Sequence, residues 1–241
     1  MKAVGYTQSL PSSDPHSLED LQLPAPDAST LTGRDLLVRV LAVSVNPVDT
    51  KVRKNRAPQP GQPEVLGYDA VGIVEATAPG ASLFRPGDRV WYAGSITRSG
   101  TNAELHVVDE RIVGPAPTSL TDAQAAAMPL TTITAWELLF DRLGVPRTAD
   151  QQGGAGRSLL VIGGAGGVGS VLLQLARQLL KACLLLPDII SSAGLIALFD
   201  LREMLPRFVS QGIQLDRALG KARTIEGNST PQHAAQVFTG L

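Results

Sequence analysis

A glycine-dense segment, residues 163–169, has the residue types and the spacing that suit the binding of phosphate groups. Gly164, Gly166 and Gly169 fit the pattern G-x-G-x-x-G. In this pattern the first glycine permits a tight turn, the second lets a pyrophosphate approach the backbone, and the third lets a helix pack closely on a strand. A helix that begins here would offer unpaired N–H groups and the positive end of its dipole to the phosphates. The pattern favours a dinucleotide site, with a purely structural glycine turn as the alternative.

The segments on either side of the glycines are those that such a site requires. Four consecutive apolar residues, 159–162, precede the turn and predict a buried strand of a parallel sheet. Apolar residues at helical spacing follow it, namely Val168, Leu172, Leu175, Ala176 and Leu179. The order strand, glycine turn and helix is the context that supports nucleotide binding.

Composition limits the classes of function that the chain can have. Its 241 residues, 44% of them hydrophobic, are enough for one large domain or two small ones. A net charge of −1 gives no basic excess that would attract nucleic acid or an anionic membrane. The sequence shows no signal-peptide core and no apolar run of membrane-spanning length, and its one cysteine, Cys183, fits a reducing compartment. We expect a cytoplasmic protein that binds neither nucleic acid nor membrane.

Residues 1 to about 113 are predicted to be rich in β-structure. Short apolar segments separated by turn residues favour a compact antiparallel barrel or sandwich, and Gly72 indicates a bend or a close approach of two backbones. The predicted strands are 35–45, 69–76, 89–92 and 106–108, with a turn at 85–88. From Thr121, a helix-capping residue, the pattern becomes helical. Residues 131–143 are predicted to form an amphipathic helix with Trp136 in its core-facing side.

Five segments in this order resemble one protein family. They are Val45–Lys51 (VNPVDTK), Leu66–Gly72 (LGYDAVG), Pro86–Val90 (PGDRV), Pro129–Glu137 (PLTTITAWE) and Gly163–Ser170 (GGAGGVGS). The chain resembles the zinc-independent medium-chain dehydrogenases/reductases of the quinone oxidoreductase type, in the branch labelled zinc-type alcohol dehydrogenase-like protein. The resemblance extends from the N-terminus to about Leu179.

This resemblance implies a fold that combines α+β and α/β parts. A GroES-like, β-rich catalytic domain would occupy residues 1–125, and an incomplete Rossmann dinucleotide-binding domain with an atypical C-terminal tail would occupy residues 126–241. NADPH would bind between the two domains, and a hydride would pass from it to a quinone, an enone or another small conjugated carbonyl. The family also implies a homodimer, for which the residues themselves give no sign.

The residues argue against zinc in spite of the family label. Where zinc-dependent relatives carry a ligand cysteine this chain has Asn46, and where they carry Gly-His-Glu it has Gly67-Tyr68-Asp69. One cysteine cannot form a four-thiolate structural site, and each histidine is interpreted as a surface or satisfied core residue rather than a ligand. The histidines are His16, His106 and His233. We expect neither a catalytic nor a structural zinc ion.

Without a metal, hydrogen-bond donors must polarise the substrate carbonyl, and a side chain or water must supply the proton. The matched motifs suggest Asn46, Lys51 and Tyr68 as catalytic residues. The suggested cofactor-binding residues are Thr131, Gly164, Ala165, Gly166, Gly167, Val168 and Gly169. Each catalytic candidate has an alternative: Asn46 could begin a turn, Lys51 could be a solvated surface charge, and Tyr68 could be a packing residue.

The resemblance ends after about Leu179. Residues 181–187 are predicted as the second parallel strand, and Asp188 follows Gly169 by 19 residues, near the position where an acid binds the ribose hydroxyls of NAD. Asp188 would make NAD(H) the alternative cofactor, unless this spacing is a coincidence. Because no second βαβ repeat follows, we expect a truncated or frame-shifted relative, or a splice-like product. The alternative function is therefore a catalytically inactive relative that keeps the GroES-like domain as a binding or interaction module.

Overall fold

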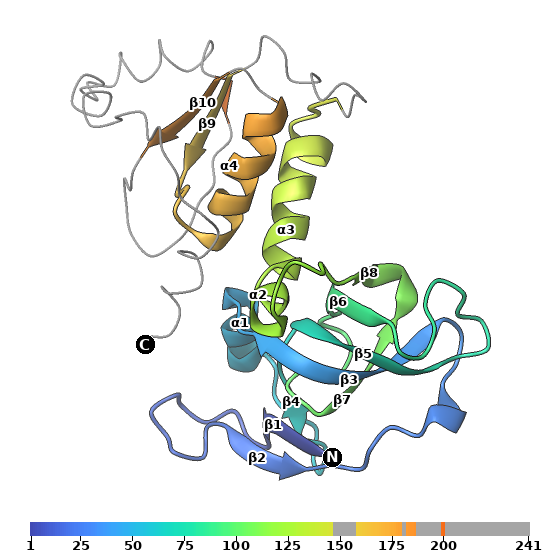
Figure 1. Ribbon diagram of the computed structural model, residues 1–241. Coiled ribbons are helices and arrows are strands. Elements are labelled where there is room, and N and C mark those ends of the chain that lie inside the picture. Colours follow the sequence, from blue (N-terminus) through green and yellow to red (C-terminus); the bar gives the residue numbers. More distant parts are fainter. Residues whose placement is uncertain (147–157, 180–181, 187–198, 201–241) are drawn as a thin grey trace. The chain divides into compact units, whose positions relative to one another are not determined.

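The computed structural model describes residues 1–146, 158–179, 182–186 and 199–200 (Figure 1). The chain divides into two units, Met1–Leu130 and Thr131–Leu241. Antiparallel sheets make up most of the first unit. The described part of the second contains a small sheet with a parallel strand pair and the helix that follows the glycine turn. Among the described residues, no helix combines the length and the apolar character needed to cross a membrane.

A five-stranded antiparallel sheet forms the centre of the first unit (Figure 1). Its strands, in their order across the sheet, are β7 (Leu105–Asp109), β3 (Asp35–Ser44), β5 (Asp69–Thr77), β6 (Arg89–Ala93) and β8 (Val113–Pro115). The strands predicted over 35–45, 69–76, 89–92 and 106–108 are therefore confirmed, with small differences at their ends. Alternation of apolar and polar residues correctly located them because one side of each strand faces the core.

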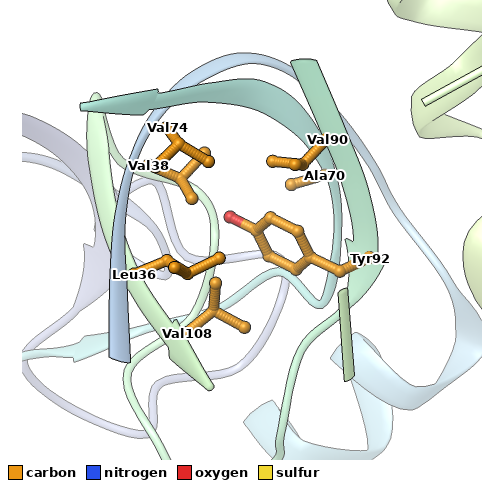
Figure 2. Packing of buried hydrophobic residues seen from close by; sticks show 7 residues of the cluster. All are labelled: Leu36, Val38, Ala70, Val74, Val90, Tyr92 and Val108. Carbon is orange, nitrogen blue, oxygen red and sulfur yellow. The ribbon is translucent and has the colours of Figure 1, made fainter. Parts of the chain in front are cut away.

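The core of this sheet is a cluster of buried side chains from four strands. Figure 2 shows the ring of Tyr92 pointing into the middle of the cluster, with smaller aliphatic side chains around it. The members are Leu36, Val38, Ala70, Val74, Val90, Tyr92 and Val108. Side chains separated by an even number of positions on a strand point to the same face of the sheet, as the pairs in β3, β5 and β6 do. The curvature of the sheet lets these side chains converge.

Gly72 lies at a point where β5 and β3 approach closely, as its position in the sequence indicated. A Cβ atom at Gly72 would overlap the carbonyl oxygen of Arg39 and lie 2.5 Å from Cγ1 of Val38. The pairing of β3 with β5 shifts register between Leu37 and Val38 and again between Val40 and Ala42. Such irregularities bend a strand and help a sheet to curve.

The first unit also contains a smaller sheet and a helix, neither of which was predicted. The sheet has the order β2 (Glu19–Gln22), β1 (Lys2–Tyr6) and β4 (Glu64–Val65), and the helix is α1 (Pro47–Asn55). Arg53 of α1 donates hydrogen bonds to the carbonyl oxygens of Leu10 and Ser17 at 2.8 and 2.9 Å. Its guanidinium lies 5.7 Å from the ring centroid of Tyr6. One cation therefore attaches the loop between β1 and β2 to α1.

Short helices and a buried carboxylate complete the first unit. They are η1 (Ala28–Thr30), η2 (Glu110–Ile112) and α2 (Asp122–Ala126). Thr121 accepts a hydrogen bond from the backbone of Gln124 and caps α2, as predicted. The fully buried Glu110 pairs with Arg34 at 2.6 Å and accepts hydrogen bonds from the N–H groups of Ser82 and Leu83. This carboxylate joins the segment before β3 to the loop between β5 and β6.

The predicted helix over 131–143 is present, but its second half has a different geometry. It begins as α3 (Pro129–Trp136), at the end of the first unit, and continues as the π-helix η3 (Glu137–Arg142). Trp136 is 41% exposed, and its ring packs against that of Phe140 in a tilted arrangement, with 4.4 Å between ring centroids and 56° between the ring planes. The expectation that Trp136 belongs to the core was wrong, because the wider turn after it changes which residues share a face.

The described part of the second unit contains the predicted strand, glycine turn and helix. Strand β9 (Ser158–Ile162) pairs in parallel with β10 (Ala182–Leu186), and α4 (Gly167–Leu179) lies between them in sequence. Strand β11 (Phe199–Asp200) pairs antiparallel with the other edge of β9. The parallel pair confirms the prediction that residues 181–187 contain a second strand. The described buried side of α4 consists of Gly169, Val171, Leu172 and Ala176, whereas Val168 and Leu175 are only half-buried.

Candidate functional site

The glycine turn between β9 and α4 is closed by backbone hydrogen bonds. The N–H of Gly166 donates to the carbonyl oxygen of Gly163 at 3.1 Å, and the N–H of Ser170 donates to that of Gly166 at 2.9 Å. Gly163 has φ +73°, in the left-handed region that favours glycine. The residue with left-handed geometry is therefore Gly163, one position before the first glycine of the G-x-G-x-x-G pattern. The sequence did not single it out, because that pattern begins at Gly164.

Different glycines of the turn serve different purposes. A Cβ atom at Gly169 would overlap the carbonyl oxygen of Gly163 and lie 2.7 Å from Cα of Gly164, so only glycine lets α4 pack this closely on the turn. A Cβ atom at Gly167 would lie 2.9 Å from Cγ2 of Thr131. Gly166 differs from both, because a Cβ atom there would meet only the carbonyl oxygen of Gly163, at an ordinary contact distance of 3.4 Å.

The open side of the turn can hold an anion. Ala165, Gly166 and Gly167 are exposed, and α4 begins at Gly167. The first N–H groups of a helix have no partner within the helix, and its dipole favours a negative charge at this end. Residues 163–169 carry no charged side chain that could occupy the place of a phosphate. The turn therefore fits the pyrophosphate of a dinucleotide.

Two further residues, Thr131 and Asp188, were predicted to bind the cofactor. Thr131 lies against the turn, since its Cγ2 is the atom that a Cβ at Gly167 would meet, so the structure brings Thr131 together with the glycines. Asp188, the candidate for the ribose hydroxyls, lies outside the described residues.

The first unit contains a cluster of buried polar side chains around Asn46, Asp49 and Asp69. Their exposed fractions are 8%, 5% and 0%. The amide nitrogen Nδ2 of Asn46 donates to Oδ2 of Asp69 at 2.9 Å. The backbone N–H of Asn46 donates to Oδ2 of Asp49 at 2.7 Å. A hydrogen-bonded cluster with two carboxylates and almost no exposure requires that each group be satisfied internally.

Local structure explains why these residues meet. Asn46 follows β3 and is the residue before the first turn of α1, where Pro47 suits the first helical position. Asp49, in the same turn, closes back on Asn46 and accepts a second hydrogen bond from the N–H of Gly67 at 2.9 Å. Asp69 is the first residue of β5, which pairs antiparallel with β3, and Ser44 of β3 is its register partner. The register of this strand pair therefore places Asp69 beside Asn46.

Asp69 also reaches the beginning of α3. Its Oδ1 accepts a hydrogen bond from the backbone N–H of Leu130 at 2.8 Å. Burial raises the pKa of this carboxyl from 3.8 to about 6; the hydrogen bonds from Asn46 and Leu130 oppose that change, and the nearby Asp49 adds to it. Asp69 lay in a matched motif, but nothing in the sequence pattern distinguished it from Asp49 as a site residue.

The other two catalytic candidates of the first unit differ in burial. Tyr68 is 2% exposed, and burial raises the pKa of its phenol. Its hydroxyl has no hydrogen-bond partner among the described residues. Lys51 is exposed on α1. The structure thus brings Asn46 together with Asp49 and Asp69, keeps Tyr68 next to Asp69 in the chain, and leaves Lys51 on the surface.

His106 is a structural residue of the core. Its Nδ1 lies 3.0 Å from the hydroxyl of Tyr92, and its Nε2 lies 2.9 Å from the carbonyl oxygen of Ser99. Because a carbonyl only accepts, Nε2 carries the proton and Nδ1 accepts from Tyr92. Burial lowers the pKa of His106 to about 4. Of the two interpretations offered for the histidines, a satisfied core residue is the one confirmed for His106.

The donor set of the first unit does not fit a zinc ion. Within the described ranges, no group of three or more His, Cys, Asp or Glu side chains is placed so that it could hold a metal. The carboxylates that contact Asn46 are those of Asp49 and Asp69, and both oxygens of each already accept N–H donors. Zinc requires three or four ligands from Cys, His, Asp or Glu.

The fold and these two sites define a class of protein. Residues 32–118 match the alcohol dehydrogenase GroES-like domain. The antiparallel unit, and the strand, glycine turn, helix and parallel second strand that follow it in the chain, agree with the fold expected from the resemblance to the medium-chain dehydrogenases/reductases. The chain belongs to this family.

Individual relatives make the comparison more specific. The chain is 43% identical over 177 residues to a zinc-type alcohol dehydrogenase-like protein of Staphylococcus epidermidis, which covers 73% of this chain and 51% of the relative. It is 35% identical over 193 residues to the 2-methylene-furan-3-one reductase of Solanum lycopersicum, over 76% of this chain and 45% of the relative. The chain spans about half the length of these curated relatives.

Solved structures show the same relationship. A protein of Rhizobium etli described as a zinc-dependent alcohol dehydrogenase is 52% identical, with a TM-score of 0.69 over 78% of this chain and 54% of that one. The quinone oxidoreductase of Escherichia coli, solved in complex with NADPH, is 25% identical, with a TM-score of 0.60 over 77% of this chain and 51% of that one.

Proposed function

We propose that the chain is an oxidoreductase that binds NADPH at the glycine turn and reduces a quinone, an enone or a similar conjugated carbonyl without zinc. The observation that carries this proposal is the geometry of the turn. Gly169 is required for packing, while Gly166 is exposed and lies directly before a 13-residue helix. Backbone N–H groups with this arrangement suit a pyrophosphate.

The names of two relatives and the side chains of the first unit support the proposed substrate class. One relative is named as a reductase of an enone and another as a quinone oxidoreductase. NADPH, when bound, supplies the hydride. Asn46 has a second N–H on Nδ2 that can donate to the carbonyl oxygen as negative charge develops there. Tyr68, with its hydroxyl unpaired among the described residues, is the candidate proton donor, and Lys51 contributes a positive field from the surface.

Binding of NADPH is tested by quenching or enhancement of its fluorescence on titration with the purified chain. Gly166→Asp is expected to abolish the change, because a carboxylate at the open side of the turn would occupy the position of the phosphates and repel them. Gly33→Asp is the matched control. Gly33 is exposed in the first unit, a Cβ atom added to it would meet nothing within 4 Å, and its φ of +57° is one that aspartate tolerates better than most residues.

Turnover is then followed as loss of NADPH absorbance with a simple quinone and a simple enone. Oxidation of NADPH that depends on either acceptor, and that persists after exhaustive chelation of zinc, is the expected result. No fluorescence change at millimolar NADPH would contradict the proposal. That outcome would favour the alternative in which the GroES-like domain acts as a binding or interaction module.

A further inference from the structure

Asp69 connects two segments through the two oxygens of one buried carboxyl. Oδ2 accepts from the side chain of Asn46 at 2.9 Å, and Oδ1 accepts from the backbone N–H of Leu130 at 2.8 Å. Leu130 lies in the first turn of α3, where helix N–H groups have no partner within the helix. Asp69 is fully buried, so water does not compete for these contacts. The same side chain therefore holds a candidate catalytic amide and caps a helix.

The ionisation of Asp69 determines how the amide of Asn46 can be oriented. A carboxylate only accepts hydrogen bonds, so Asn46 must turn Nδ2 toward Asp69 and keep Oδ1 on its other side. A protonated carboxyl can also donate. The amide of Asn46 can then turn over, so that Oδ1 accepts from Asp69 and both N–H groups point elsewhere.

The surroundings of Asp69 make protonation accessible near neutral pH. From α1, the charged group that acts on it is the carboxylate of Asp49, which repels a second negative charge. From β3 and β6, its register partners are Ser44 and Ala93, which carry no charge. From α3, it meets the N–H of Leu130, a partial positive charge only. Burial, opposed by the two hydrogen bonds, sets the pKa at about 6.

We propose that Asp69 is a positioning residue, which fixes the amide of Asn46 in one orientation when it is ionised and releases it when it is protonated. This inference rests on the proposed function for its catalytic consequence, but the orientation of Asn46 can be measured without it. Reduction would be fastest above the midpoint of the Asp69 titration, where Asn46 is held in a single orientation.

The first experiment follows the Asn46 side-chain NH₂ and the Leu130 backbone amide by ¹H–¹⁵N NMR of the full chain from pH 4.5 to 8. The side-chain signal is identified by its loss in Asn46→Ser. Both signals are expected to shift with one common midpoint near pH 6. Asp20→Asn, at an exposed aspartate of β2, is the matched control and is expected to leave this titration unchanged.

The second experiment compares kinetics of wild type and Asp69→Asn. An amide has one acceptor oxygen, so residue 69 could no longer accept from both Asn46 and Leu130 unless Asn46 turns over. We expect kcat to fall roughly 100-fold with little change in KM, the pattern for a donor that acts in the transition state. We also expect the inflection near pH 6 in the pH–kcat profile of wild type to disappear, which a merely structural role of Asp69 would not produce.

The outcomes separate the two proposals. An Asn46 signal that does not titrate between pH 4.5 and 8 in wild type overturns the positioning role, whether or not the chain is active. A variant Asp69→Asn with the wild-type kcat and pH profile overturns it as well. Absence of any turnover by wild type contradicts the proposed function, while the NMR titration still decides the role of Asp69, even if Asp69→Asn fails to fold.

Discussion

In the first unit the candidate site is built from side chains, whereas in the second it is built from backbone. Asn46, Asp49 and Asp69 hold one another through buried hydrogen bonds, and burial raises the pKa of Asp69 to about 6. Residues 163–169 contain no titratable side chain. They can hold an anion because their glycines carry no Cβ atoms that would block the backbone. The side-chain cluster is therefore sensitive to pH and to the loss of single hydrogen bonds, whereas the glycine turn is sensitive to added side-chain volume.

This difference separates two kinds of specificity. A side-chain cluster can be tuned, because each pKa responds to burial and to neighbours. A glycine turn offers donors whose charge state never changes, so it suits a ligand that must be held under all conditions. Substitutions at three positions test this contrast, from the largest expected effect to the smallest.

Gly169→Val should have the largest effect, because its added atoms would overlap the carbonyl oxygen of Gly163 and the backbone of Gly164. We expect the free energy of unfolding to fall by about 3 kcal/mol, at the upper end for overpacking, and NADPH binding to be lost. Denaturant unfolding and the fluorescence titration measure both. Gly166→Ala is the control, since its Cβ lies in ordinary contact at 3.4 Å, and it should leave the free energy of unfolding within about 0.5 kcal/mol of wild type. Equal destabilisation by both variants would contradict the assigned roles.

His106 should give the first unit a dependence on pH that the glycine turn lacks. Its pKa of about 4 in the folded protein lies below the 6.5 of an unfolded chain. Between these values the unfolded state binds a proton that the folded state does not, so stability falls as pH decreases from 6.5 to 4, by up to roughly 3 kcal/mol. Asp69, whose folded pKa is raised, contributes the opposite slope, because stability from its protonated form is lost as pH rises through about 6.

The variant His106→Gln isolates the histidine contribution. Glutamine can still accept from Tyr92 and donate to the carbonyl oxygen of Ser99, but it does not titrate. We expect it to be about 1 kcal/mol less stable than wild type at pH 7.5 and to lose this disadvantage at pH 4.5. Urea unfolding at both pH values is the measurement, and a stability difference independent of pH would disprove the assignment.

Lys51→Met should have the smallest effect. Lys51 is exposed on α1, where salt and water screen its charge. We expect kcat/KM with the quinone or the enone to change by about threefold or less, and the change to shrink at high ionic strength. A loss of 100-fold or more would instead assign Lys51 a direct contact with the reacting groups.

The sequence located what depends on local pattern. The sequence pattern placed four of the five strands of the central sheet, all but β8, while Gly72 indicated a close backbone approach and Thr121 a helix start. Four apolar residues before the glycines predicted β9, and the parallel partner β10 followed from the βαβ pattern. In each case the physical cause is periodicity or the geometry of a single residue, and both can be read without long-range contacts.

What the sequence could not locate depends on contacts between distant segments. Asp69 meets Asn46, 23 residues away, only because β5 and β3 pair in one particular register, and it meets Leu130 only because α3 begins at the same place. Trp136 was misplaced because the π-helix after it shifts the pattern of faces. The left-handed residue of the turn is Gly163 rather than Gly164, since the motif records spacing and not dihedral angles.

Arg53 has a consequence for the candidate amide. Asn46 precedes α1, and Arg53 lies near the end of the same nine-residue helix, with its guanidinium bonded to two carbonyl groups of the loop between β1 and β2. Helix α1 is thus anchored at both ends. The carboxylates of Asp49 and Asp69 hold Asn46 at its N-terminal end, and the guanidinium of Arg53 holds its C-terminal end. A lysine at position 53 could not span both carbonyls with a planar fork. Loss of these hydrogen bonds would let the C-terminal end of α1 move, and with it the orientation of the helix whose N-terminal end carries the Asn46 amide. The loop between β1 and β2 therefore supports the candidate site, although it lies far from Asn46 in the sequence.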